Sequence, residues 1–203
     1  MHLLKDNSTK EMLQNMSSIY FSDELNKLFL KTPVKLSSNF DQLLNPGSDD
    51  DLSYMMAIDY KTYMLDDILQ KVDRAGMCVS LEGREPFLDQ HIIEFAAQLP
   101  SDYKLHKGIK KYPLRQIVHK YVPRQMMERP KMGFGIPIAD WLKNELKVFV
   151  DEATDTVFLE QQGLFNVNEV KELCRQFYNG KEQLHTKIWY LLMFQMWYKK
   201  WMS

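Results

Sequence analysis

Two cations and two glycines are gathered in one short stretch of the chain, Arg129-Pro130-Lys131-Met132-Gly133-Phe134-Gly135-Ile136-Pro137. Each proline lacks a backbone N–H and fixes its own φ, so this stretch cannot continue a helix. The glycines permit backbone geometry that other residues avoid, and they let a ligand approach closely. We therefore expect a rigid loop that presents Arg129 and Lys131 to an anion, although a basic loop of this kind can also be an ordinary solvated connection.

Charge is unevenly distributed around this loop. Nine lysines and arginines but a single acid, Glu128, lie between Lys104 and Lys131. Seven acids and one lysine lie between Asp41 and Asp67. The basic belt suits a polyphosphate or a nucleic acid, but it can equally be a solvated face paired with acids elsewhere. A net charge of −1 argues against binding of a bulk polyanion, and no aromatic pattern for base stacking is apparent.

The composition indicates one compact domain, because 203 residues with 45% hydrophobic content suffice for a core. Cys78 and Cys174 are far apart and form no C-x-x-C motif, so neither a zinc site nor a disulfide framework is expected. The five histidines show no metal-ligand spacing, and His91, His106 and His119 are expected at the surface. No apolar run approaches the ~20 residues of a membrane span, and Asp6 interrupts any signal peptide. We expect a cytoplasmic protein.

The predicted secondary structure is all helical, without a strand pattern longer than a few residues. A mostly buried helix over 52–64 is expected to be interrupted at Leu65-Asp66-Asp67, with a second helix following to about Val79. A polar loop is expected over 36–51, and the last helix, over about 183–201, should pack centrally because it is apolar nearly all round. The helix that follows Asp67 and runs to about Val79 is expected to bury an apolar stripe that consists of Ile68, Val72, Ala75, Met77 and Val79.

Local signals define several helix ends. Ser8 and Glu11 have the spacing of a capping box, Asp89 and either Asn166 or Asn168 are expected N-caps, and Pro113 suits a first helical turn. A single helix is expected from Ile138 through Val150.

Three blocks of sequence, in this order, resemble the synthetase domain of glutamine-dependent asparagine synthetases. The first is Lys71-Val72-Asp73-Arg74-Ala75-Gly76-Met77 with Ser80-Leu81-Glu82-Gly83-Arg84-Glu85-Pro86-Phe87-Leu88-Asp89, the second is Lys111-Tyr112-Pro113-Leu114-Arg115, and the third is the stretch 129–137, followed by Trp141. The resemblance extends over roughly residues 50–200 and is weaker over 1–50. It implies two domains, a helical segment with a loop over 1–50 and an asparagine-synthetase-like helical domain over 51–203.

This resemblance implies a two-step reaction. The aspartate side-chain carboxylate attacks the α-phosphorus of ATP, which gives β-aspartyl-AMP and pyrophosphate, and ammonia then displaces AMP. Such a reaction needs cations where negative charge collects. The resemblance assigns this catalytic role to Lys131, and it implies ATP or pyrophosphate binding by Arg129, Lys131 and Gly133. Arg129 could instead tie the loop to the protein.

Other charged residues of the blocks allow two interpretations each. Glu82 and Arg84 could shape the aspartate or nucleotide pocket, or they could form an ion pair that pins their loop. Asp73 and Arg74 are more typical of a structural pair within a helix. Arg115 could face phosphate, but an arginine near the end of a helix is also common for structural reasons.

Several features of the family are absent from this sequence. No two of its eight glycines are adjacent, so the pyrophosphate loop Ser-Gly-Gly-x-Asp-Ser is missing, as is the acidic Gly-x-Gly-x-Asp-Glu segment that helps to hold magnesium. Position 2 is His2, whereas the glutaminase domain of the family begins with a cysteine nucleophile. We therefore expect a mainly α fold, the helical C-terminal portion of an α/β ATP-pyrophosphatase-type (adenine nucleotide α-hydrolase-like) synthetase domain without its sheet.

Three functions remain open on this basis. The first is a part of an asparagine synthetase, inactive alone, whose partners are the missing glutaminase and ATP-binding portions. ATP and Mg would serve the parent enzyme, and neither is expected to bind this chain tightly. The second is a non-catalytic remnant or interaction module with an apolar surface that favours self-association. The third is part of a relative that amidates another acceptor. Neither a nucleic acid nor a membrane is expected as a partner.

Overall fold

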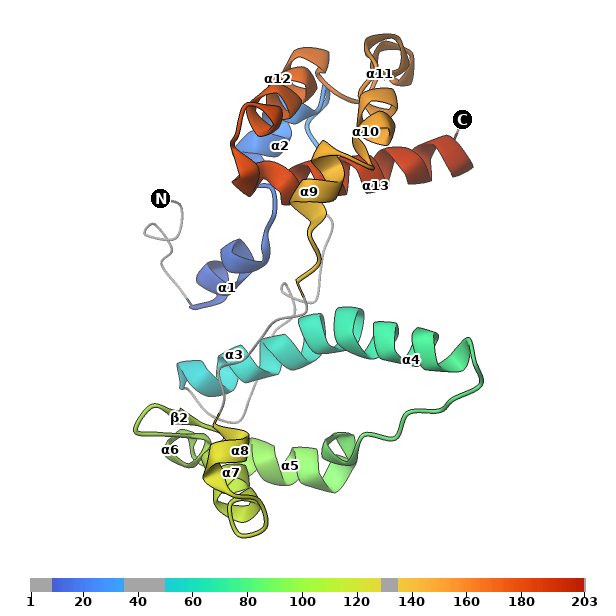
Figure 1. Ribbon diagram of the computed structural model, residues 1–203. Coiled ribbons are helices and arrows are strands. Elements are labelled where there is room, and N and C mark those ends of the chain that lie inside the picture. The colour runs from blue at the N-terminus through green and yellow to red at the C-terminus, as the bar shows by residue number, and fades with distance from the viewer. Residues whose placement is uncertain (1–8, 35–49, 129–134, 203) are drawn as a thin grey trace. The chain divides into compact units, whose positions relative to one another are not determined.

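The computed structural model describes residues 9–34, 50–128 and 135–202 (Figure 1). Its internal contacts divide the chain into two compact units. Unit 1 comprises Met1–Met16 and Leu36–Met132, and unit 2 comprises Ser17–Lys35 and Gly133–Ser203. The expected domains 1–50 and 51–203 rest on the extent of the family resemblance and stay a prediction. Each unit is described below by itself.

Unit 1 consists of helices and one short hairpin. Its elements are α1 (Thr9–Ser17), α3 (Asp51–Asp59), η3 (Tyr60–Leu69), α4 (Gln70–Met77), η4 (Pro86–Leu88), α5 (Gln90–Gln98), α6 (Ser101–Lys104), β1 (Leu105–His106), β2 (Ile109–Lys110), α7 (Tyr112–Val118) and α8 (Arg124–Met127).

The elements α3, η3 and α4 form one continuous helix over residues 51–77, whose middle part is a π-helix (Figure 1). The predicted interruption at Leu65-Asp66-Asp67 is therefore wrong. Asp67 forms an ion pair of 2.6 Å with Lys71 one turn later, an arrangement that supports a helix. The hydroxyl of Thr62 donates a hydrogen bond of 2.8 Å to the carbonyl oxygen of Ile58, which also lies within the helix.

The predicted core of this long helix is wrong as well. Among the described residues of unit 1, only Ser53 and Ile58 are buried, and neither η3 nor α4 contains a buried residue. Val72, Met77 and Val79 are 49%, 53% and 71% exposed. The helical spacing identified an apolar face correctly, but spacing alone does not say whether another element covers that face.

A two-stranded hairpin, in which β1 pairs with β2, lies within the basic belt that begins at Lys104. Leu105 pairs with Lys110 and His106 with Ile109, in antiparallel register. The two loop residues, Lys107 and Gly108, have φ values of 48° and 80°. Positive φ at both positions is typical of a type I′ turn, whose twist matches that of the paired strands. The fold is nevertheless mainly helical, as predicted.

The helices and one isolated β-bridge, between Phe29 and Phe165, are the regular structure of unit 2 within its described residues. Its elements are α2 (Ser22–Leu28), α9 (Ile138–Lys143), α10 (Lys147–Ala153), α11 (Thr156–Gln162), α12 (Val167–Tyr178), η5 (Glu182–Leu184) and α13 (His185–Trp201).

The last helix, α13, organises the core of unit 2, which confirms the prediction that it packs centrally. Ile188 and Leu192 belong to a buried cluster shared with α9, α10 and α12, whereas Leu191 belongs to a second cluster shared with α2, α11 and α12. Figure 1 shows α9 and α10 lying against α13. Phe29 stacks on Phe165 with ring centroids 4.7 Å apart, which attaches the α2 segment.

Helix ends were predicted more reliably than helix continuity. The side chains of Asp89 and Asn166 accept hydrogen bonds from the first turns of α5 and α12, and Pro113 lies in the first turn of α7, as expected. Ser8 lies outside the described residues. The single helix expected from Ile138 through Val150 is wrong, because α9 ends at Lys143 and the C-cap residue Asn144 donates its side-chain amide to the carbonyl oxygen of Asp140.

Candidate functional site

The residues that carry the strongest predicted chemistry, Arg129, Lys131 and Gly133, lie outside the described residues. Their roles therefore stay predictions. The structure describes both flanks of their segment, with Glu128 on one side and Gly135 on the other. Glu128 is the C-cap of α8, and its backbone N–H donates to the carbonyl oxygen of Arg124 at 2.9 Å.

Glu82 and Arg84 form an exposed, two-pronged ion pair. The Nε of Arg84 lies 3.0 Å from one carboxylate oxygen of Glu82, and a terminal nitrogen lies 3.2 Å from the other. The side chain of Arg84 is 83% exposed and that of Glu82 is 66% exposed, so the pair contributes little to stability. The contact is the one expected if the pair fixes the loop after α4, and a role in a substrate pocket stays a prediction.

Arg115 connects two parts of unit 1. Its Nε donates a hydrogen bond of 3.1 Å to the carbonyl oxygen of Lys110, at the end of the hairpin. Its guanidinium also lies 3.9 Å from a carboxylate oxygen of Glu128. The same oxygen of Glu128 is 3.6 Å from Nε2 of His119. Arg115 therefore lies next to the residue that precedes the Arg129–Pro137 stretch.

His119 was missed by sequence reasoning, which placed it at the surface. Its side chain is only 10% exposed, and its Nδ1 is buried without a hydrogen-bond partner among the described residues. His119 and Glu128 are nine positions apart across a turn, so no periodic pattern could have connected them.

The hairpin borders a cavity of about 500 Å³ lined by aromatic, charged and apolar side chains of Asp102, Tyr103, Leu105, His106, Lys107 and Tyr112. The rings of His106 and Tyr112 lie 4.6 Å apart and are tilted by 37°. Sequence reasoning found no aromatic residues placed for stacking, because the hairpin that brings His106 near Tyr112 was not predicted. Lys107, Lys110 and Lys111 are exposed around this hairpin, within the predicted basic belt.

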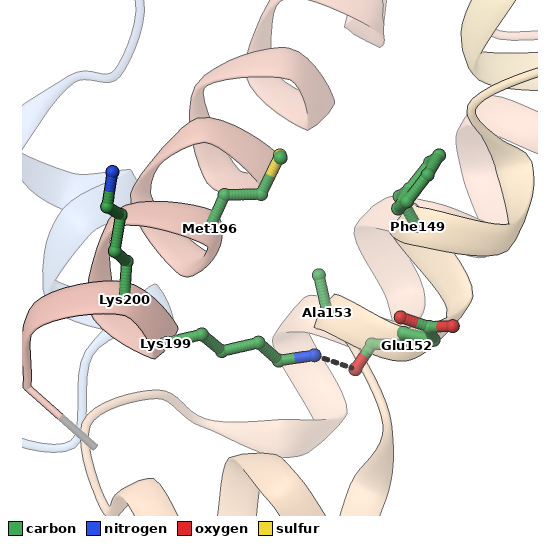
Figure 2. A pocket seen from close by; sticks show the side chains of 6 residues that line it. All are labelled: Phe149, Glu152, Ala153, Met196, Lys199 and Lys200. Carbon is green, nitrogen blue, oxygen red and sulfur yellow. Dashed lines mark hydrogen bonds between the residues drawn. The ribbon is translucent and has the colours of Figure 1, made fainter.

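Unit 2 contains a second cavity, of about 320 Å³, between α10 and α13. Figure 2 shows Phe149 and Ala153 facing Met196 across it, with Lys199 and Lys200 on the α13 side. The Nζ of Lys199 donates a hydrogen bond of 3.4 Å to the carbonyl oxygen of Glu152 and lies over the ring of Phe158. None of the predicted site residues lines this cavity.

The described residues provide no metal centre. Over residues 9–34, 50–128 and 135–202, no group of three or more His, Cys, Asp or Glu side chains could hold a metal ion. No helix in the described part of the chain is both long and apolar enough to cross a bilayer.

Comparison with known proteins identifies the class. A family model described as asparagine synthase matches residues 4–199, so this chain belongs to the asparagine synthase family. Glutamine-hydrolyzing asparagine synthetase 1 of Bacillus subtilis is 35% identical over 154 residues, which cover 75% of this chain and 24% of the relative.

A second relative, from Mycobacterium tuberculosis, carries a provisional name as a glutamine-hydrolyzing asparagine synthetase. It is 34% identical over 151 residues, 73% of this chain and 23% of that protein. The chain thus spans about a quarter of the length of these two curated relatives. No solved structure matches it significantly.

Proposed function

We propose that this chain supplies the helical C-terminal part of an ATP-dependent asparagine synthetase. The observation that carries the proposal is the family match over residues 4–199, which includes the Arg129–Pro137 stretch. In the proposed reaction, an oxygen of the aspartate side-chain carboxylate forms a bond to the α-phosphorus of ATP as the bond to the β-phosphate oxygen breaks. Ammonia derived from glutamine then attacks the acyl carbon of β-aspartyl-AMP, and AMP leaves.

Lys131 is the proposed catalytic cation. Negative charge develops on the α-phosphoryl oxygens and on the departing pyrophosphate, and a lysine on a rigid loop offers a compact positive charge for it. In the same proposal Arg129 contacts phosphate, and Gly133 allows the backbone to approach it. Glu82, Arg84 and Arg115 are assigned to the surroundings of the pocket or to its support.

The proposal assigns the magnesium site to other parts of a complete synthetase, because the acidic Gly-x-Gly-x-Asp-Glu segment is absent from this sequence. We therefore assign no step to Mg in this chain. ATP binding is likewise assigned mainly to other parts of a complete synthetase, in keeping with the absence of the adjacent glycines of a pyrophosphate loop. On this proposal the isolated chain is inactive, and it works in the cytoplasm together with the glutaminase and ATP-binding portions.

The exposed apolar residues of unit 1 support an arrangement in which another part of the enzyme covers them. Phe87 and Phe95 are 62% and 65% exposed, and Met77 and Val79 of the same unit are 53% and 71% exposed. Exposed apolar surface of this extent is typical of an interface. The same observation supports the second candidate function, an interaction module without catalysis, and amidation of another acceptor remains the third.

A chimeric enzyme tests the proposal. The matching 154-residue segment of the Bacillus subtilis synthetase is replaced by this chain, and aspartate-dependent exchange between ATP and pyrophosphate is measured. We expect activity that Lys131→Ala reduces by about 10²-fold or more, as for loss of one preorganised contact to developing charge. The control is Lys120→Ala, which removes an exposed cation of the same basic belt and should change the rate less than twofold.

Each result of this experiment discriminates between the candidates. An active chimera in which Lys131→Ala has no effect would disprove the role of Lys131. A folded chimera that activates a different carboxylate would favour the third candidate. A folded but inactive chimera would favour the interaction module. Independently, an antibody against this chain should detect a polypeptide far above 24.1 kDa in the source cells.

A further inference from the structure

The cavity of about 500 Å³ in unit 1 is enclosed by α6, β1 and the start of α7, which lie close together (Figure 1). Its aromatic side chains are Tyr103, His106 and Tyr112, and its charged side chains are Asp102 and Lys107. Cavities of this size that combine aromatic or apolar walls with a few polar groups are typical of sites for small ligands. Among the described residues assigned to the surroundings of the proposed reaction, none lines this cavity.

The polar groups of the cavity are available to a ligand. Within the described part of the chain, the carboxylate of Asp102, the hydroxyl of Tyr103 and the ammonium of Lys107 have neither a hydrogen-bond nor an ion-pair partner. The two opposite charges therefore line one cavity without pairing with each other. Such an arrangement suits a ligand that carries an anionic group at one end and hydrogen-bond donors at another.

The aromatic side chains of the cavity provide a wall for a planar group. The rings of His106 and Tyr112 lie 4.6 Å apart with a tilt of 37°, and both residues are half-buried, so each ring is supported by the other. Tyr103 is 58% exposed, and its ring has no aromatic partner among the described residues. An exposed aromatic ring at the edge of a cavity is the kind of surface on which a nucleotide base stacks.

Lys107 has a backbone conformation that is uncommon for a lysine. It precedes Gly108 in the hairpin turn, and the φ values of the two residues are 48° and 80°. Glycine, asparagine and aspartate are the usual residues at the first of these positions, because a Cβ atom in the left-handed region crowds the backbone. Strained residues cluster at ligand sites, and here the strained residue presents a cation to the cavity.

We propose that this cavity binds a free mononucleotide. The base stacks on Tyr103, the ribose hydroxyls donate hydrogen bonds to Asp102, and the phosphate pairs with Lys107. The exposed Lys110 and Lys111 add positive potential around the phosphate. A single-stranded nucleic acid is the competing ligand for a basic belt, but the carboxylate of Asp102 would repel successive phosphates. The inference does not depend on the proposed function.

Calorimetric titration of the 203-residue chain with AMP tests the proposal. We expect one saturable site with a dissociation constant on the order of 0.1 mM, since an open cavity offers a small ligand few contacts. Adenosine lacks the phosphate and ribose 5-phosphate lacks the base, so each should bind about tenfold more weakly or worse. Absence of saturable AMP binding up to about 5 mM would overturn the proposal.

Matched substitutions locate the site. Tyr103→Ala should weaken AMP binding about tenfold through loss of stacking, whereas Tyr121→Ala, at an 82% exposed tyrosine outside the cavity, should change it less than twofold. Lys107→Asn should also weaken binding about tenfold, with Lys120→Ala as the matched control. Equal effects of the cavity variants and their controls would contradict the site.

The choice of asparagine at position 107 separates a lost charge from a lost fold. Asn-Gly is a preferred pair for this turn, so Lys107→Asn should leave the midpoint of thermal unfolding unchanged or raise it. Weaker AMP binding together with an undiminished midpoint would support a direct contact of Lys107 with phosphate. Weaker binding that accompanies a lowered midpoint would mean that Lys107 acts only through the hairpin, and this role of Lys107 would be wrong.

The ribose contact has its own test. Asp102→Ala and the use of 2′,3′-dideoxy-AMP should each weaken binding about threefold. Their combination should weaken it no more than either change alone, because both remove the same hydrogen bonds. Additive losses would show that Asp102 does not contact the ribose.

Two further titrations distinguish the other sources of binding. An oligoadenylate of about eight nucleotides that binds far more tightly than AMP, and loses affinity with Lys120→Ala, would overturn the proposal in favour of a single-stranded nucleic acid. Lys131→Ala should leave AMP binding unchanged, and a loss would assign the nucleotide to the 129–137 stretch instead. An inactive chimera whose AMP binding is intact would remove the proposed function and leave this inference standing.

Discussion

The two units of this chain bury their apolar residues to very different extents. Unit 2 has two closely packed clusters around α13, with Leu142, Phe177 and Ile188 fully inaccessible. The described part of unit 1 buries only Ser53 and Ile58, although it is just as rich in large apolar side chains. Helices are apolar on one side and must cover that side with another layer. Unit 2 contains its own second layer, whereas the described part of unit 1 leaves most of its large apolar side chains exposed.

The largest expected effect comes from a matched pair of phenylalanines. Phe177→Ala should lower the free energy of unfolding by about 3–5 kcal/mol, because a fully buried ring is replaced by a cavity. Phe95→Ala removes a ring that is 65% exposed and should change the free energy of unfolding by less than about 0.5 kcal/mol. Urea denaturation of the 203-residue chain measures both. Equal losses would show that the two units do not differ in this way.

Association of the isolated chain gives the next effect. The exposed apolar residues of unit 1 should cause self-association, which sedimentation velocity would detect as a mass that rises with concentration. The double variant Val79→Lys/Phe95→Lys should weaken association about tenfold or more, since it removes two large apolar contacts. The control Val148→Lys/Val157→Lys, at exposed positions of unit 2, should weaken it far less. A monomer at all concentrations would contradict the prediction.

One ion pair in each unit provides a further comparison of the two units, with smaller expected changes in stability. Lys187 of α13 pairs with Glu24 of α2, and its side chain is only 18% exposed. Lys187→Met should therefore cost about 1–2 kcal/mol, whereas Arg84→Met, at the exposed pair in unit 1, should cost less than about 0.5 kcal/mol. Thermal unfolding gives both values. The comparison would fail if Arg84→Met proved the more harmful.

The smallest expected effect is on the stability of the protein at acidic pH. Hydrogen bonds from Arg175 and Gln176 lower the pKa of Glu172 to about 2 from its usual value of 4.5. A lowered pKa contributes stability above pH 4.5 that is lost as the pH falls toward 2. Glu172→Gln should therefore flatten the decline in stability between pH 4.5 and 2. The change should be slight, because the ion pair of Glu172 with Arg175 lies at the surface, where solvent screens it. A large change would mean that surface charge, and not the core, maintains unit 2.

Sequence patterns predicted local features of this fold well. Asp89, Pro113 and Asn166 occupy the expected positions at helix ends, because caps depend on a few neighbouring residues. The hairpin escaped prediction since its strands are only two residues long. The π-helix escaped because side-chain spacing does not distinguish a short change in backbone hydrogen bonding from an ordinary helix.

The candidate site was predictable only where a contiguous motif exists. The stretch around Lys131 stands out in the sequence, whereas the contact of His119 with Glu128 depends on how the chain turns between α7 and α8. The prediction of buried apolar residues in unit 1 was wrong for a related reason. The spacing of Val72 and Met77 shows which side of the helix is apolar, but coverage depends on parts of a protein far away in sequence.

The attachment of α2 to α13 has a consequence for synthesis of the protein. The hydroxyl of Tyr20 donates to the carbonyl oxygen of Lys187, 167 residues later. A ribosome adds on the order of 5–20 residues per second, so α2 emerges roughly 8 to 33 seconds before its partner exists. During that interval Leu28 and Phe29 lack the helices that cover them. These apolar side chains stay uncovered until α13 is made, and slow translation of unit 1 would prolong that interval.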